Sequence, residues 1–82
     1  MKTNIFLTAI KNRSKLKFLY SLTEIIIEPY FLAREKSGRR VIFGRVKRTN
    51  AVRKFEYNKI SNIRILNEDK FSPVIPIISQ VS

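Results

Sequence analysis

The fold is decided by residues 34–55, which read REKSGRRVIFGRVKRTNAVRKF. Nine residues between Arg34 and Lys54 are basic and one is acidic, so this stretch holds eight of the chain's eleven net positive charges. β-Branched and aromatic residues are threaded between the cations: Val41, Ile42, Phe43, Val46, Val52 and Phe55. Such alternation is typical of strands that bury one face and expose a basic one. The stretch therefore predicts a folded, mainly β domain whose surface attracts polyanions.

Length and composition narrow the class of protein. The 82 residues suffice for one domain, and the absence of cysteine leaves no disulfide or thiolate metal site to stabilise it. The N-terminal residues do not resemble a secretory signal, and no apolar run approaches the roughly 18 residues that a membrane span needs. We therefore expect a cytoplasmic protein that does not associate with membranes.

Periodicity predicts one short helix and about five strands. Residues 4–13 form the expected helix, with Asn4 as its N-cap and an apolar stripe at Phe6, Ala9 and Ile10 that ends in Arg13. The expected extended segments lie within residues 15–66: Lys15–Tyr20, Glu24–Glu28, Tyr30–Arg34, Arg40–Lys47, Val52–Tyr57 and Ser61–Leu66.

Glycine and proline mark the breaks between these segments. Gly38 supplies a positive-φ position in the turn 35–39, whereas Gly44 in mid-strand indicates a bulge or tight bend. Pro29 marks a strand end, an edge or a bulge. The expected architecture is a small SH3-like or Sm-like five-stranded barrel with a short N-terminal α-helix. It would span residues 1–71, and residues 72–82 would form an extended C-terminal tail behind an anchor at Phe71.

Catalytic chemistry has little support in the sequence. There is no histidine and no cysteine, so the commonest general base, metal ligand and thiol nucleophile are missing. There is no Gly-rich phosphate loop either. We expect a protein that is not an enzyme and that uses no cofactor or metal.

The ordered set of short motifs resembles the WYL domain of bacterial regulators in its short free-standing form. The resemblance covers roughly residues 5–73 and rests on these pieces: Ala9-Ile10, Leu16–Tyr20, Ile27-Glu28-Pro29, Leu32-Ala33-Arg34 with Gly38, Val41–Gly44, Arg53–Ile60, Ile63–Leu66 and Phe71-Ser72-Pro73. It implies an Sm-like or SH3-like barrel that senses a ligand, typically a nucleotide or single-stranded nucleic acid, met by basic and aromatic residues on the sheet. Members usually regulate transcription or phage defence, often fused to a winged helix-turn-helix.

The chain departs from that family at positions that bear on the ligand. Val41-Ile42-Phe43 stands where the family has its Trp-Tyr-Leu triplet, and Tyr30 replaces a common histidine. Arg45-Val46 replaces a polar or aromatic pair after the Gly44 position. Each change removes a group that would stack on or hydrogen-bond to a base.

Seven residues are the candidate ligand contacts: Tyr30, Arg34, Phe43, Arg45, Lys47, Arg48 and Arg53. The cations would neutralise phosphates, and Phe43 or Tyr30 would offer a stacking surface. Alternatives stay open: Phe43 is a core residue, Tyr30 packs at the barrel edge with its hydroxyl in water, and Arg34 pairs with Glu28 or Glu56. A bulge at Gly44 would turn Arg45 away from Phe43.

Two functions follow from these features. The first is a non-enzymatic regulatory module that binds single-stranded nucleic acid or nucleotides through the basic sheet face. The alternative is a protein-interaction or oligomerisation module without a nucleic-acid ligand, which uses exposed edge strands and the apolar tail. Whether the ligand is DNA, RNA or a small nucleotide stays open at this level.

Overall fold

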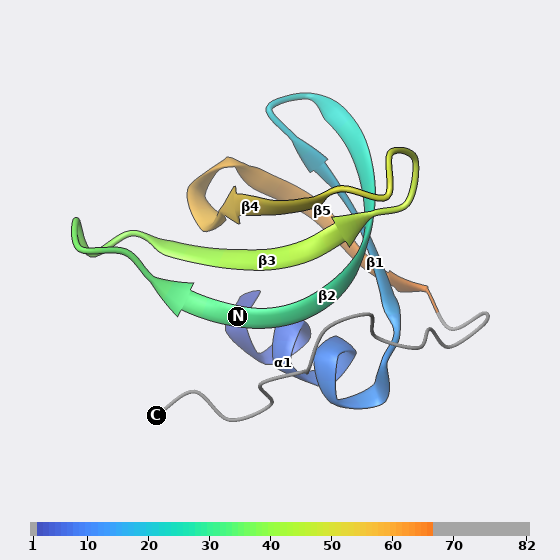
Figure 1. Ribbon diagram of the computed structural model, residues 1–82, viewed down its shortest axis with the longest axis horizontal. Helices are drawn as coiled ribbons and strands as arrows, with labels where there is room; N and C mark the ends of the chain where they lie inside the picture. The colour runs from blue at the N-terminus through green and yellow to red at the C-terminus, as the bar shows by residue number, and fades with distance from the viewer. Residues whose placement is uncertain (1, 67–82) are drawn as a thin grey trace.

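The computed structural model describes residues 2–66, which form one α-helix and five antiparallel strands and thus confirm a mainly β fold. The helix is α1 (Lys2–Asn12), and the strands are β1 (Lys15–Tyr20), β2 (Thr23–Arg34), β3 (Arg40–Val46), β4 (Val52–Glu56) and β5 (Ile60–Leu66), with a 3₁₀ turn, η1 (Tyr57–Lys59), before β5. Figure 1 shows α1 against one side of a strongly curved sheet. The expected tail 72–82 and its anchor Phe71 lie outside the described residues.

Helix α1 begins two residues earlier than expected, so Asn4 lies inside the helix and does not cap it. The expected apolar stripe is confirmed, because its three apolar members are buried: Phe6, Ala9 and Ile10. The helix ends in a Schellman motif, in which the Arg13 N–H donates to the Ile10 carbonyl and the Ser14 N–H donates to the Ala9 carbonyl, at 3.2 and 2.8 Å. Arg13 adopts the left-handed conformation that this motif requires, with φ 55°.

Strands β1 and β2 are joined by a two-residue turn. Tyr20 pairs with Thr23, and both residues between them have positive φ, 48° at Ser21 and 73° at Leu22. Positive φ at both central positions is the type I′ arrangement, which matches the twist of antiparallel strands. Asparagine and glycine are the usual residues there, so Leu22 occupies this position at a conformational cost.

Strand β2 runs unbroken from Thr23 to Arg34, because Pro29 marks a bulge and not a strand end. The pairing with β3 shifts between Pro29↔Gly44 and Phe31↔Phe43, which leaves one extra residue, Tyr30, in β2. Gly44 therefore lies opposite the bulge, and β3 itself keeps a regular alternation. A Cβ on Gly44 would lie 2.8 Å from Ile27 Cδ1 and 2.9 Å from the Glu28 carbonyl oxygen, so glycine is required by close approach.

The strands form one sheet in the order β4-β3-β2-β1-β5, which corrects the expectation of a closed barrel. In the part of the chain that the structure describes, β4 and β5 are the two edges and do not pair with each other. Sheet curvature still brings the end of β4 and the turn η1 close to the end of β1. The Glu56 N–H donates to the Tyr20 hydroxyl (3.2 Å), and the Ser21 N–H donates to the Lys59 carbonyl (3.2 Å). The expected last residue of the fourth strand, Tyr57, belongs to η1 instead.

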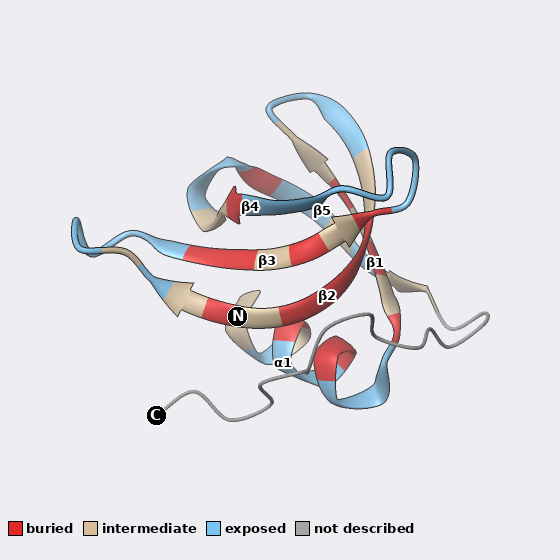
Figure 2. Ribbon diagram, in the orientation of Figure 1, coloured by how far each residue is buried: buried red, intermediate tan, exposed pale blue. Residues whose placement is uncertain are grey.

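The core lies between α1 and the concave face of the sheet. It contains the helix stripe together with buried residues from every strand: Leu16, Phe18, Ile27, Leu32, Ile42, Val46, Phe55 and Ile60. Figure 2 shows buried positions along β2, β3 and α1, whereas the turns are exposed. The turns thus carry the polar residues that are free to meet a ligand, and the strands set the distances between them.

Candidate nucleic-acid interface

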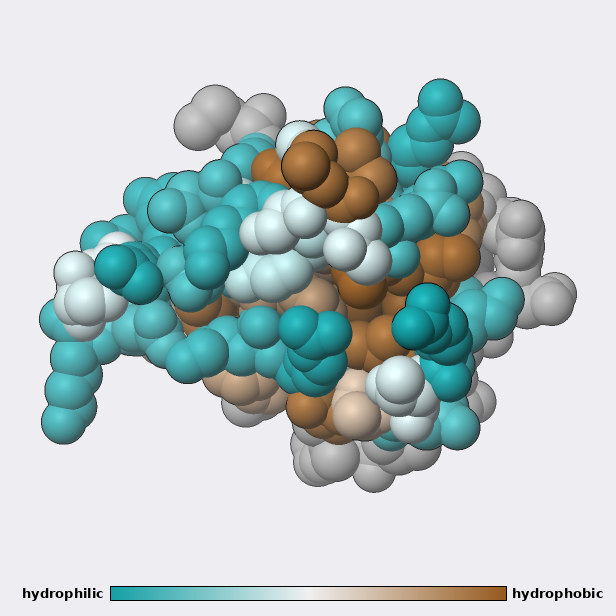
Figure 3. All heavy atoms as spheres, turned by 90° about the horizontal axis from the view of Figure 1, so that it is seen from above, coloured by the Kyte–Doolittle hydropathy of each residue, from teal (hydrophilic) through white to brown (hydrophobic). Residues whose placement is uncertain are grey.

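A groove lies between the start of β2 and the β3–β4 turn. It has a volume of about 610 Å³ and is lined by Thr23, Glu24, Ile25, Ile26, Val46, Lys47, Arg48, Thr49 and Arg53. Three of the seven candidate residues, Lys47, Arg48 and Arg53, therefore meet at one site. Figure 3, which looks down on the side of the β1–β2 turn, shows apolar surface in a hollow bordered by hydrophilic groups.

Backbone hydrogen bonds hold the β3–β4 turn beside β2. The Lys47 N–H donates to the Ile26 carbonyl at 2.9 Å, which extends the β2–β3 pairing by one residue. The Val46 N–H donates to the Ala51 carbonyl at 2.9 Å, and the Asn50 N–H donates to the Val46 carbonyl at 2.7 Å. Asn50 has φ 60°, a conformation that asparagine tolerates better than most residues. The turn therefore presents its cations from an ordered backbone.

The groove is positively charged, and few carboxylates neutralise the charge of its cations. Within residues 2–66, none of Lys47, Arg48 and Arg53 forms an ion pair with a carboxylate, and all three are exposed. Glu24 is the acidic residue on the rim, and its carboxylate lies 3.4 Å from Lys17 Nζ. The site therefore suits an anion, because three cations face one carboxylate that already has a partner.

Arg53 differs from the other two cations in having an aromatic support. Its guanidinium carbon lies 4.9 Å from the centroid of the Phe55 ring, within the range of a cation–π contact. Phe55 is completely buried, and Phe18 and Tyr20 pack edge-on against it at centroid distances of 5.4 and 4.9 Å. The aromatic cluster thus forms a firm base under Arg53.

Arg45 is a structural cation and does not line the groove. Its Nη2 and Nε lie 2.6 and 2.8 Å from Glu28 Oε1, and both side chains are largely buried. The hydrogen bond to Glu28 raises the pKa of Arg45 above its ordinary value. This pair gives Glu28 a cationic partner, which is Arg45 and not Arg34. It also separates Arg45 from Arg53, because Arg53 pairs with Gly44 and so belongs to the opposite face of the sheet.

Neither predicted stacking residue lies in the groove. Phe43 shares a face with Arg45, is half-buried, and stacks on Phe31 with a centroid distance of 4.7 Å and an interplanar angle of 19°. Tyr30 is completely buried, which excludes both the predicted base platform and the predicted edge position with its hydroxyl in water. The bulge explains why the prediction for Tyr30 was wrong. Tyr30 is the extra residue of β2, so the two-residue period of a strand does not predict which face of the sheet its side chain takes.

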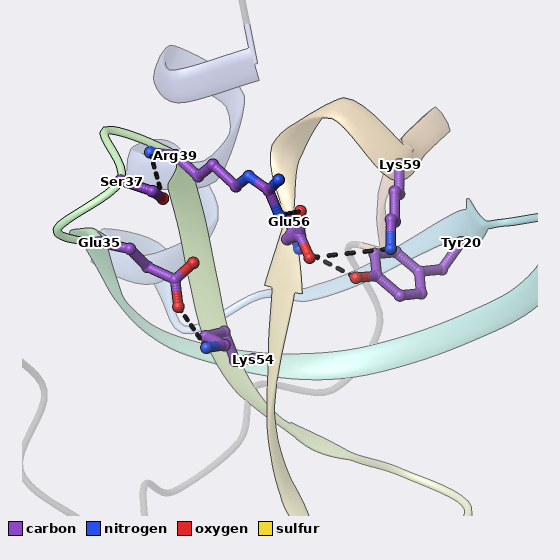
Figure 4. A network of polar contacts seen from close by, with 7 residues as sticks. All are labelled: Tyr20, Glu35, Ser37, Arg39, Lys54, Glu56 and Lys59. Atoms are coloured by element: carbon purple, nitrogen blue, oxygen red, sulfur yellow. Dashed lines mark hydrogen bonds and ion pairs between the residues drawn. The ribbon is translucent and has the colours of Figure 1, made fainter.

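Arg34 lies at the far end of the hairpin, exposed and directly opposite Arg40. The predicted ion pair with Glu28 or Glu56 does not form. Glu28 is matched by Arg45, and Glu56 accepts from Arg39 at 3.3 Å and lies 3.7 Å from Lys59. Figure 4 shows the contacts of Glu56, which lies between Arg39 and Lys59 beside Tyr20. The same figure shows a separate contact between Lys54 and Glu35. The hydrogen bond to Glu35 raises the pKa of Lys54.

These ion pairs separate the nine cations of residues 34–54 into those with a carboxylate partner and those without one in the described chain. Arg39, Arg45 and Lys54 each contact a carboxylate of the described chain. The other six form two clusters at opposite ends of β3. The groove cluster is Lys47, Arg48 and Arg53, and the hairpin cluster is Arg34, Lys36 and Arg40.

Six groove residues were not predicted as ligand contacts from the sequence: Thr23, Glu24, Ile25, Ile26, Val46 and Thr49. The register of β2 against β3 would have found them, because it places Ile27 opposite Val46 and so brings the start of β2 beside the β3–β4 turn.

Within residues 2–66 no set of three or more His, Cys, Asp and Glu side chains is placed to hold a metal. No helix in the same residues has the length and apolar character to cross a membrane.

No model of a known protein family matches the chain, and no curated protein matches it. Among solved structures, the chain is similar to proteasome accessory factor B/C (PafBC) of Arthrobacter aurescens, with a TM-score of 0.76 and 22% identity. The similarity covers 87% of this chain and 12% of PafBC, so the chain spans about an eighth of that protein's length. At this identity the likeness shows a shared fold and nothing further.

Proposed function

We propose that this chain is a non-enzymatic regulatory module that binds single-stranded nucleic acid or nucleotides in the groove between β2 and the β3–β4 turn. The observation that carries the proposal is the convergence of three cations, Lys47, Arg48 and Arg53, on a groove with an apolar floor. The resemblance to a WYL domain and the fold shared with PafBC support a ligand-sensing role in regulation.

The proposed mechanism is phosphate neutralisation by cations that an ordered turn presents. Lys47 and Arg48 lie on the turn itself, so their charges reach a strand that passes across the groove. Each contact releases counterions from the nucleic acid, and for a single strand the logarithm of the affinity falls by about 0.7 per contact for each tenfold rise in salt. The apolar floor of Ile25, Ile26 and Val46 favours a ligand with an apolar part over a bare inorganic anion.

The test is fluorescence anisotropy with labelled single-stranded DNA, single-stranded RNA and duplex DNA at about 50 and 200 mM salt. We expect single strands to bind more tightly than duplex, and a Lys47→Ala/Arg48→Ala variant to lose affinity and to show a shallower salt dependence. Arg64→Ala, which removes an exposed cation of β5 outside the groove, is the matched control. Salt-independent binding, or equal losses in the two variants, would refute the proposal.

A further inference from the structure

The chemistry of the groove indicates which part of a nucleic acid it recognises. Lys47 and Arg48 supply charge alone, and charge does not distinguish a nucleic acid from any other polyanion. Arg53 has a different environment, because the ring of Phe55 supports its guanidinium at 4.9 Å while the residue as a whole stays exposed. A cationic plane supported from one side has its other side available to a ligand.

The strand opposite Arg53 contributes no side chain beside it. Its cross-strand partner is Gly44, and Ile27 Cδ1 of β2 occupies the space that a Cβ on Gly44 would take, at 2.8 Å. The supporting ring is itself held by Phe18 and Tyr20, whose rings meet it edge-on at angles of 78° and 89°. Arg53 is thus the cation of the groove whose guanidinium has a firm aromatic base.

The other groove residues fit a heteroaromatic ring. Ile25, Ile26 and Val46 provide apolar surface for the faces of a base. The hydroxyls of Thr23 and Thr49 and the carboxylate of Glu24 provide hydrogen-bonding groups for its polar edge. Bases in single strands are commonly stacked on aromatic rings or on arginine planes, and both kinds of surface tolerate every base.

We infer that the groove recognises a nucleobase, with the guanidinium of Arg53 as the stacking platform and with Lys47 and Arg48 on the adjoining phosphates. The inference rests on the proposed function and goes further, because it requires bases and not only phosphates. It also assigns to Arg53 the stacking role that was predicted for Phe43 or Tyr30.

The experiment compares two labelled oligonucleotides of about 12 residues at one salt concentration, one with bases and one abasic throughout. The two carry the same phosphates, so any difference in affinity measures base recognition. We expect the base-bearing strand to bind at least about tenfold more tightly than the abasic strand. We expect Arg53→Lys, which keeps the charge but loses the plane, to remove most of that difference.

Arg64→Lys is the matched control, because Arg64 is an exposed arginine of β5 outside the groove. It should leave both affinities unchanged, and thermal unfolding should show that both variants are folded. Equal salt-dependent binding of the two strands by the unaltered protein would overturn the inference and leave the proposed function standing. Binding of neither strand would overturn both. A full tenfold difference retained by Arg53→Lys would assign base recognition to another residue and overturn the role of Arg53.

Discussion

At the scale of the residue, Arg45 and Arg48 look alike in the sequence but have different environments. Arg45 contacts the Glu28 carboxylate at 2.6 Å, whereas Arg48 is exposed in the groove. We expect Arg45→Met to lower the urea midpoint of unfolding, because it leaves a largely buried carboxylate without its partner, and to leave affinity for a single strand nearly unchanged. Arg48→Met should do the reverse. A large loss of affinity with unchanged stability in Arg45→Met would contradict the assignment.

Gly44 of β3 lies so close to β2 that a larger residue would clash there. A Cβ there would lie within 3.2 Å of Ile27 Cδ1, the Glu28 carbonyl oxygen and Pro29 Cα, and two of these three atoms belong to the backbone. We therefore expect Gly44→Ala to lower the free energy of unfolding by about 1–3 kcal/mol, measured by urea denaturation.

Gly38 is the comparison for this prediction, because it has φ 90° and open space around the position of a Cβ. Gly38→Asn should cost less than Gly44→Ala, since asparagine tolerates positive φ. Equal costs at the two positions would show that steric conflict with β2 is not the cause.

The residue scale also shows what the sequence could reveal. Simple alternation along Arg40–Val46 places Phe43 and Arg45 on one face, and the structure has this arrangement because β3 itself contains no extra residue. It failed at Tyr30, because the bulge that follows Pro29 inserts one residue and breaks the two-residue period. The sequence left a bulge as one of several alternatives at both Pro29 and Gly44, and it could not tell which strand contained the extra residue.

At the scale of the element, the β1–β2 turn is held by residues that do not favour it. Leu22 has φ 73° and is 92% exposed, so it has the conformational cost of a left-handed residue without burial to offset it. We expect Leu22→Gly to raise the free energy of unfolding by about 1 kcal/mol, measured by urea denaturation. A destabilised variant would show that the leucine side chain makes a contact that its exposure does not reveal.

The curved sheet is held across its open side by a hydrogen bond between elements. The Glu56 N–H at the end of β4 donates to the Tyr20 hydroxyl at the end of β1, at 3.2 Å. We expect Tyr20→Phe to cost about 1 kcal/mol in the free energy of unfolding, because it leaves the Glu56 N–H without this acceptor. Tyr57→Phe is the control, since Tyr57 packs its ring on Phe6 at 5.1 Å. A larger loss in the control would refute this role of Tyr20.

Elements were more predictable than their assembly. The helix stripe, the turn at Gly38 and the strands from Lys15 to Leu66 follow from local periodicity, which needs no knowledge of distant residues. Closure into a barrel depends on whether β4 and β5 pair, and that depends on twist and curvature accumulated over the whole sheet. The groove was hidden for the same reason, because Thr23–Ile26 and Lys47–Arg53 meet only through the β2–β3 register.

At the scale of the whole molecule, the two cationic clusters set the length of ligand that the surface accommodates. Arg40 and Lys47 are seven residues apart along β3, which corresponds to roughly 23 Å. Strand β4 lies beside β3 between the clusters, and its residues Val52–Lys54 are exposed. Arg34 and Arg40 are directly opposite each other on β2 and β3, so their like charges repel. A bound anion would reduce this repulsion.

We therefore expect affinity for single strands to rise with length up to about seven nucleotides, at about 3.4 Å per stacked nucleotide, and then to level off. An Arg34→Ala/Arg40→Ala variant should weaken binding of a long strand and leave binding of a trinucleotide in the groove unchanged. Anisotropy titrations over a series of lengths, at one salt concentration, measure both effects. If the variant weakens the trinucleotide and the long strand equally, the hairpin cluster acts only through its general field, and a continuous path from the hairpin cluster to the groove along β4 is excluded.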